Sequence, residues 1–129
     1  MKENKITIII NKSIDEVFEF TINPKNTPLW IESIAEEVSD EYPPKINTKY
    51  KNRGKDSDWN VYKVVEFKRN KIFTLTELDG NYSVKYTYNR LGENKTEMTY
   101  FEWVKKGEIQ NPFTQKIIDK LKSTIENKQ

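Results

Sequence analysis

The residues best suited to hold a ligand are tyrosines spaced two or four positions apart. Tyr82, Tyr86 and Tyr88 share one parity with Val84, and the positions between them carry Ser, Lys and Thr. Because successive side chains of a strand point to opposite faces, this alternation predicts one apolar face that points inward. The rings there could wall an apolar pocket while a hydroxyl orients a polar group of the ligand. Alternatively, the rings fill the core of a sheet and their hydroxyls reach water at its edge.

Glu102 is the carboxylate that could add acid–base chemistry to such a pocket. The apolar face of residues 96–104 is ambiguous, and we favour Met98 and Tyr100 inward, which puts Glu102 on the same face. A partly buried carboxyl can have a raised pKa and move a proton, with Tyr86 polarising a carbonyl. The competing interpretation, which we favour for this residue, places Glu102 near the rim, in contact with solvent.

The composition removes many other chemistries. The chain has no Cys and no His, which excludes disulfides, a thiolate nucleophile, an imidazole base and an ordinary zinc site. No Gly-rich phosphate loop or nucleophile–base pair is found in the sequence. We therefore expect no metal and no cofactor.

The elements that must position these side chains begin with a strand over residues 5–11. Ser13 and Glu16 then form a Ser-x-x-Glu capping box, which predicts a helix from about residue 14 that ends at Asn23-Pro24. A second brief helix over 26–31 delivers Trp30, for which a core position is favoured over a ligand contact.

From residue 32 to residue 105 turn signals separate strand-like segments, which predicts a meander of six strands. In residues 58–67 the parity is muddier than in the Tyr segment. Trp59, Val61, Val65 and Phe67 share a face that also carries a lysine, and we expect Trp59 and Val61 to point inward.

The last predicted element is an amphipathic helix with Asn111 as its N-cap and Pro112 at its first position. One stripe of this helix is apolar and must be buried against the sheet, whereas the last residues, 127–129, should fray. The stripe comprises Phe113, Ile117, Ile118, Leu121 and Ile125. The full set of predicted ligand-contacting residues is Trp30, Trp59, Val61, Tyr82, Val84, Tyr86, Tyr88, Met98, Tyr100, Phe113, Ile117 and Leu121.

Charge is balanced overall but not locally. The 22 Lys and Arg against 20 Asp and Glu give a net charge of +2, too little to indicate a nucleic-acid partner. Residues 32–42 carry only acids and residues 45–55 carry Lys and Arg without an acid before position 56. We expect these segments to pair in a hairpin joined at Pro43-Pro44, with the basic stripe on a solvated outer face rather than on an anion site.

Length and hydropathy point to a single domain over residues 1–129. A chain of 129 residues without a linker fits one compact unit with a real core. No stretch approaches the roughly 20 apolar residues of a membrane span, and no apolar leader precedes the first strand. We therefore expect a cytoplasmic protein, whose oligomeric state one chain does not reveal.

The resulting element order, βααββββββα, resembles the helix-grip fold of the START-like (SRPBCC) superfamily, and in particular its small bacterial polyketide cyclase/dehydrase-like branch. Residues 8–18 look like the opening strand and capped helix of that family, residues 23–30 like its second helix, and residues 120–126 like its closing helix. Two features depart from the family pattern: the closing helix is short, and the link at 105–111 has one Gly.

The resemblance implies an α+β fold in which a curved seven-stranded antiparallel sheet wraps around the C-terminal helix. It further implies a pocket between sheet and helix that binds a small, largely apolar or aromatic molecule. Two alternatives stay open. One is a cyclase- or dehydratase-like enzyme that uses Tyr86 and Glu102, and the other is a protein-interaction module of the chaperone-activator type.

Overall fold

A computed structural model describes residues 1–127 and confirms the predicted order of elements, with one short 3-10 helix added. The elements are β1 (Glu3–Ile10), α1 (Ile14–Ile22), η1 (Pro24–Asn26), α2 (Thr27–Trp30), β2 (Glu36–Ser39), β3 (Lys49–Arg53), β4 (Asn60–Lys68), β5 (Ile72–Glu77), β6 (Tyr82–Gly92), β7 (Lys95–Val104) and α3 (Gln115–Glu126). Fraying was expected for residues 127–129, of which 128 and 129 lie outside the described part of the chain. None of the described helices is long and apolar enough to cross a membrane.

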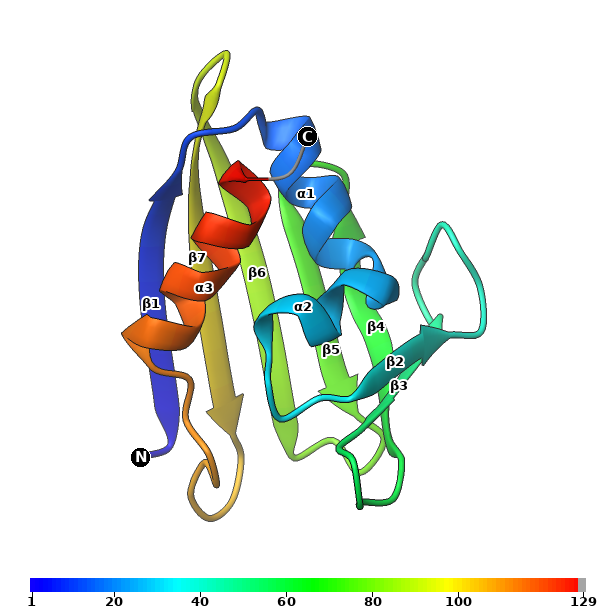
Figure 1. Cartoon of the computed structure of the whole chain (residues 1–129). Coiled ribbons are helices and arrows are strands. Elements are labelled where there is room, and N and C mark those ends of the chain that lie inside the picture. The colour runs from blue at the N-terminus through cyan, green and yellow to red at the C-terminus, as the bar shows by residue number, and fades with distance from the viewer. Residues whose placement is uncertain (128–129) are drawn as a thin grey trace.

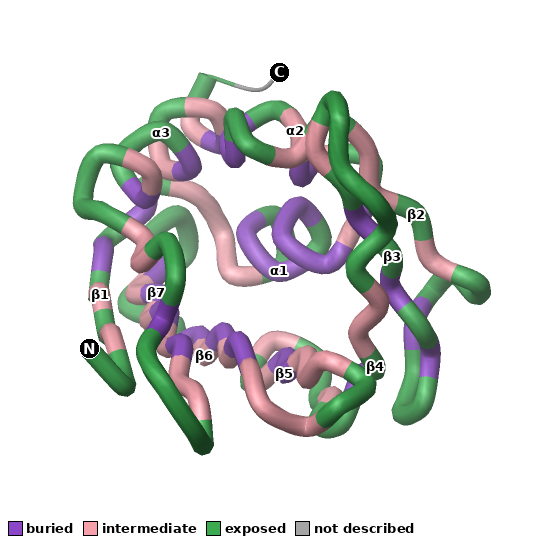
Figure 2. The backbone as a smooth tube through the Cα atoms, turned by 90° about the horizontal axis from the view of Figure 1, so that it is seen from below, coloured by how far each residue is buried: buried purple, intermediate pink, exposed green. Residues whose placement is uncertain are grey.

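The seven strands form one antiparallel sheet in the order β1-β7-β6-β5-β4-β3-β2. The first strand of the chain pairs with the last, so that Glu3 lies opposite Trp103 and Ile10 opposite Thr96. The sheet curls, and α1, α2 and α3 all lie on its concave side (Figure 1). The end-on view shows α1 inside the curve, with α2 and α3 closing the side that the strands leave open (Figure 2).

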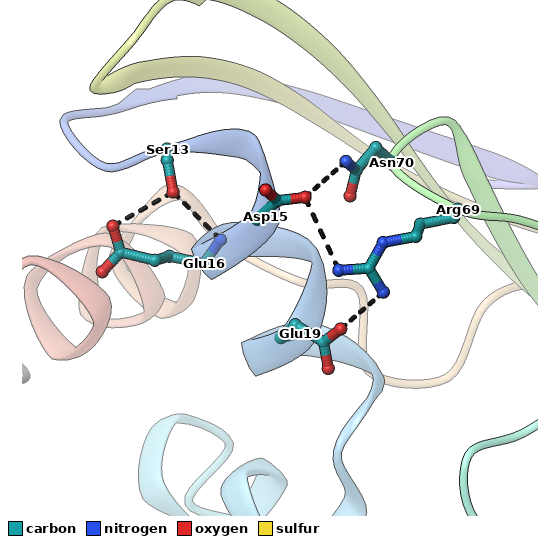
Figure 3. Close-up of polar contacts among 6 residues, drawn as sticks. All are labelled: Ser13, Asp15, Glu16, Glu19, Arg69 and Asn70. Carbon is teal, nitrogen blue, oxygen red and sulfur yellow. Dashed lines mark hydrogen bonds and ion pairs between the residues drawn. The ribbon is translucent and has the colours of Figure 1, made fainter.

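Helix α1 begins where the capping box predicts. The Ser13 hydroxyl accepts the Glu16 backbone amide at 3.2 Å and donates to the Glu16 carboxylate at 3.0 Å. At the turn between β4 and β5, Arg69 bonds Glu19 at 2.5 Å and lies 3.5 Å from Asp15 (Figure 3). These contacts hold the exposed side of α1 to the sheet while its other side is buried.

The start of the final helix is corrected from Asn111-Pro112 to Gln115. Thr114 is the N-cap, and its hydroxyl accepts the Ile117 amide at 3.3 Å. Phe113, which precedes this cap, is not part of the helix, because its backbone groups bind side chains of the sheet. The Phe113 amide donates to Glu102 and the Phe113 carbonyl accepts from Asn4.

Strand β4 carries a second correction, because Trp59 and Val61 do not point inward. A bulge between Val64 and Glu66 shifts the parity of the strand, so that Tyr62 and Val64 face the interior before it and Phe67 after it. Trp59 precedes the strand and is 40% exposed, with the Arg53 guanidinium 4.8 Å from its ring centroid. The inserted residue breaks the strict period of two that the sequence argument assumed.

The two oppositely charged segments pair as expected, although the first contributes only the four residues of β2. Glu36 lies opposite Arg53, whose Nη2 is 3.0 Å from the Glu36 carboxylate. The lysines of β3, Lys49 and Lys51, are exposed on the outer surface. The interior-facing residues of the same strand are Tyr50 and Asn52, both buried.

Candidate functional site

A cavity of about 90 Å³, which we call the inner chamber, lies between the concave face of the sheet and the first two helices. It is lined by Thr21 and Thr27 from helices, by Glu37 and Asn52 from the short strands β2 and β3, and by aromatic residues of the longer strands. The complete lining is Thr21, Thr27, Ile31, Ile34, Glu37, Asn52, Tyr62, Phe73, Leu75, Tyr82, Val84, Tyr86, Tyr100 and Phe113.

The inner chamber continues into a wider outer chamber of about 570 Å³. Six residues line both spaces: Ile31, Ile34, Asn52, Tyr62, Tyr82 and Phe113. The outer chamber is bounded by the loops that follow α2, β5 and β7, at the lower end of the molecule in Figure 1, the end from which Figure 2 is viewed. The two chambers adjoin at these shared residues, and the outer chamber lies at this end of the molecule.

The predicted inward face of β6 is confirmed. Val84, Tyr86 and Tyr88 are buried, and Tyr82 is partly buried against the core. The Tyr86 ring stacks on Phe73 with centroids 5.9 Å apart, and meets the Tyr100 ring edge-on at 5.4 Å. Rings that contact each other in this way form a rigid wall.

The hydroxyls of this wall differ in their partners. Tyr88 and Thr21 share a 2.6 Å hydrogen bond, and the Tyr82 hydroxyl donates to Glu102 at 2.6 Å. The Tyr86 hydroxyl has no hydrogen-bond partner within residues 1–127, and its oxygen is not fully shielded from solvent. It therefore presents a free donor and acceptor to the inner chamber.

Burial raises the pKa of the chamber tyrosines above its ordinary value. For Tyr86 and Tyr100 desolvation is the largest cause, and the charge of Glu102 adds to it. The pKa of Tyr62 and that of Tyr82 are raised as well, again mainly by burial. These hydroxyls are therefore neutral at physiological pH, able to donate hydrogen bonds but not to act as bases.

Glu102 is fully buried, so the expectation that it sits solvated near the rim was wrong, whereas the inward orientation of Met98 and Tyr100 is confirmed. Its Oε2 accepts from Asn4 Nδ2 and from the Phe113 amide, both at 2.8 Å. Its Oε1 accepts the Tyr82 hydroxyl. Because both oxygens of Glu102 accept hydrogen bonds, this carboxylate holds Asn4, Tyr82 and the Phe113 backbone in place.

Glu37 is a chamber residue that the sequence argument missed. Thr27 Oγ1 donates to its Oε1 at 2.6 Å and Asn52 Nδ2 donates to its Oε2 at 3.0 Å. Burial raises the pKa of this carboxyl, and the two hydrogen bonds oppose the rise. In the sequence Glu37 stands in an acidic run that looks like solvated surface, and only the parity of a four-residue strand distinguishes it from Glu36.

Comparison with solved structures identifies the architecture. The protein XoxI from Bacillus cereus superposes with a TM-score of 0.75 at 12% identity, over 98% of this chain and 97% of that one. Ara h 8.0201 superposes with a TM-score of 0.65 at 13% identity, over 95% and 96%. A polyketide-cyclase-like protein from Corynebacterium glutamicum gives 0.58 at 20% identity, over 79% and 64%. The chain has the helix-grip fold. No family model and no curated protein matches it by sequence.

Within this helix-grip fold, five of the predicted contact residues line the inner chamber: Tyr82, Val84, Tyr86, Tyr100 and Phe113. The others lie elsewhere. Trp30 is a buried core residue whose ring meets Phe113 at 5.8 Å, and Met98 and Leu121 are fully buried in the core. The Tyr88 hydroxyl is hydrogen-bonded to Thr21, and Ile117 packs against the core beside a surface groove.

The position of the pocket also differs from the expected one. None of the described residues of α3 lines either chamber, because Phe113 and the loop after α2 lie between that helix and the cavity. Helix α3 therefore packs into the core through Ile118, Leu121 and Ile125 and does not line the cavity. Among the described residues no three acidic side chains gather closely enough to hold a metal ion.

Proposed function

We propose that this protein binds a small, largely apolar or aromatic molecule in the pocket formed by the two chambers. The observation that carries the proposal is the free Tyr86 hydroxyl in an aromatic cavity that opens to solvent. Buried polar groups are normally paired, so an unpaired hydroxyl facing open space marks a place for a ligand atom or a water molecule. Walls that are mostly apolar with a few placed polar groups are the usual composition of a ligand site.

The volumes set the manner of binding. The inner chamber of about 90 Å³ is below the usual range for a whole ligand pocket, whereas the outer chamber of about 570 Å³ is within it. The ligand therefore places a small group in the inner chamber and its bulk in the outer one. Phe113, Ile31 and Ile34 line both spaces and would contact the ligand where it passes between them.

The enzymatic alternative has less support, because Glu102 is occupied by Asn4, Tyr82 and the Phe113 amide. A general acid or base needs a free position within hydrogen-bonding reach of the substrate. We assign Glu102 a positioning role instead. Membership of the polyketide cyclase/dehydrase-like branch remains part of the proposal, supported by the shared fold with the Corynebacterium glutamicum protein.

The test is a ligand screen with a blocked pocket as control. Thermal-shift measurements and native mass spectrometry with small aromatic and apolar compounds are expected to yield binders of the wild-type chain. Ile34→Trp, which fills the passage between the chambers, should abolish binding, because Ile34 lines both of them. Val65→Trp places the same side chain on an exposed position of β4 and should leave binding unchanged. Binders that are unaffected by Ile34→Trp would contradict the proposed site.

A further inference from the structure

We propose that the ligand carries a cationic head group, an amine or quaternary ammonium on an apolar body, and that Glu37 is its counter-ion. This inference rests on the proposed function, since it specifies the class of molecule that the pocket binds. It is carried by the charge inventory, the aromatic walls and the shape of the chambers.

The inner chamber is lined by an acidic residue and by no basic one. Among the fourteen residues that line the inner chamber, Glu37 is an acid and none is Lys or Arg. Glu102 lies directly behind the wall, bonded to Tyr82. Neither carboxylate forms an ion pair with any described residue. Two carboxyl groups without a cationic partner favour a positive ligand charge, because Coulomb interactions are stronger beside the low-dielectric interior of a protein than in bulk water.

Glu37 is held in place by neutral donors and keeps capacity for a ligand. Each of its oxygens accepts one hydrogen bond from protein, Oε1 from Thr27 and Oε2 from Asn52. A carboxylate has about four acceptor positions, so a donor on each oxygen leaves room for further donors such as those of an ammonium group. Charge-assisted bonds of this kind are stronger than neutral ones.

The walls suit a cation as well. Six of the fourteen lining residues are aromatic: Tyr62, Phe73, Tyr82, Tyr86, Tyr100 and Phe113. The Tyr86 and Tyr100 rings stand at 82° to each other and form a corner. The faces of aromatic rings are electronegative and attract a cation that lies within about 6 Å of the centroid. A carboxylate in a chamber lined by aromatic rings therefore favours an ammonium over an anion or a neutral group.

The size of the chambers determines the orientation of such a ligand. An inner chamber of about 90 Å³ takes a head group of a few heavy atoms, and the apolar body extends into the outer chamber past Ile31 and Ile34. The outer chamber carries charges of both signs, on Glu77, Lys106 and Glu108, whereas Glu37 is the charged residue of the inner chamber. The cation is therefore selected at the deep end of the pocket.

The experiment compares three probes of nearly equal shape: phenethylammonium, 2-phenylethanol and phenylacetate. Their affinities are measured by calorimetry and by amide chemical shifts in solution NMR at neutral pH. We expect phenethylammonium to bind at least about tenfold more tightly than 2-phenylethanol, and phenylacetate more weakly still. Glu37→Gln should reduce the preference for the amine over the alcohol to about twofold or less.

Glu36→Gln is the matched control. Glu36 is the preceding residue of the same strand, and its carboxylate bonds Arg53 on the outer surface. This variant should keep the wild-type preference. If Glu37→Gln does not fold, the wild-type comparison alone still decides whether the head group is cationic.

The outcomes separate the two proposals. If 2-phenylethanol binds with shifts at chamber residues and the amine binds no more tightly, the cationic inference is overturned and the apolar pocket stands. If none of the three probes binds at concentrations up to about 10 mM, both proposals fail. A preference for the amine that survives Glu37→Gln would overturn the role of Glu37.

Discussion

Glu102 and Phe113 are joined by a 2.8 Å hydrogen bond in which the Phe113 backbone amide donates to the Glu102 carboxylate. Asn4 completes a small ring by donating to Glu102 and to the Phe113 carbonyl, at 2.8 and 2.9 Å. The arrangement ties β1, β7 and the segment before α3 together at one buried point. It also fixes the Phe113 ring, which stacks on Tyr100 with centroids 4.3 Å apart.

Replacing Glu102 with Ala should strongly destabilise the protein. The change leaves the donors of Asn4, Tyr82 and the Phe113 amide without their acceptor. Each unsatisfied buried donor costs about 1–3 kcal/mol, so we expect the free energy of unfolding to fall by about 3 kcal/mol or more. Urea denaturation measures it. Glu97→Ala, on the outer side of the same strand, should change stability by no more than about 0.5 kcal/mol. A similar loss in both variants would contradict the anchoring role.

The two tyrosines Tyr86 and Tyr88 should respond differently to loss of their hydroxyls. Tyr88→Phe removes a buried hydrogen bond to Thr21 and should lower the free energy of unfolding by about 1 kcal/mol. Tyr86→Phe removes a hydroxyl that has no partner among the described residues, and should leave stability within about 0.5 kcal/mol of wild type. Denaturation of both variants in the absence of ligand makes the comparison. An equal loss in Tyr86→Phe would show that its hydroxyl is paired.

The stability of the protein should depend on pH through Glu37. Burial raises the pKa of this carboxyl in the folded state above the ordinary value of 4.5. As the pH rises through the window between these two values, the unfolded chain loses its proton first and gains stability relative to the folded one. The free energy of unfolding therefore falls across that window and is level above it.

Glu37→Gln removes this dependence. Urea midpoints from about pH 4 to about pH 8 should show the variant gaining stability relative to wild type as the pH rises. Glu77, whose pKa is also raised by burial, is present in both chains and cancels in the difference. A difference that is constant with pH would contradict the raised pKa of Glu37.

The tryptophans Trp30 and Trp59 have opposite environments and should differ in their contribution to stability. Trp30→Ala empties a buried site against Phe113 and should cost about 3–5 kcal/mol. Trp59 is 40% exposed, so its replacement by Ala removes little buried contact and should cost much less. Thermal denaturation followed by far-UV circular dichroism compares the two. Equal losses would argue for an inward Trp59.

The parts of the fold that were predictable from the sequence are those with a strong local pattern. The alternation at Tyr82 to Tyr88 identified the inward face of β6, and Ser13 with Glu16 identified the start of α1, because both depend on residues close in sequence. The β4 face was wrong because the bulge between Val64 and Glu66 depends on pairing with β5. The start of α3 was wrong because Asn4 and Glu102, distant in sequence, bind the backbone of Phe113.

The site was only partly predictable for the same reason. Tyr86, Tyr100 and Phe113 were expected from apolar patterns, since aromatic residues on a buried face usually identify themselves. Glu37 was not, because an acid in an acidic run has no local feature that separates a partly buried, hydrogen-bonded carboxylate from a solvated one. Its partners, Thr27 and Asn52, come from a helix and a neighbouring strand.

Phe113 belongs to no helix or strand, yet its ring lines both chambers and stacks on Tyr100. The depth of the pocket is thus separated from the length of α3, since a residue outside regular structure covers the cavity while Glu102 keeps its backbone in place. In the proposed binding function, selectivity for ligand size would change through the side chain at this one position, without altering the sheet or the helix. A short closing helix is therefore compatible with a cavity on the concave side of the sheet.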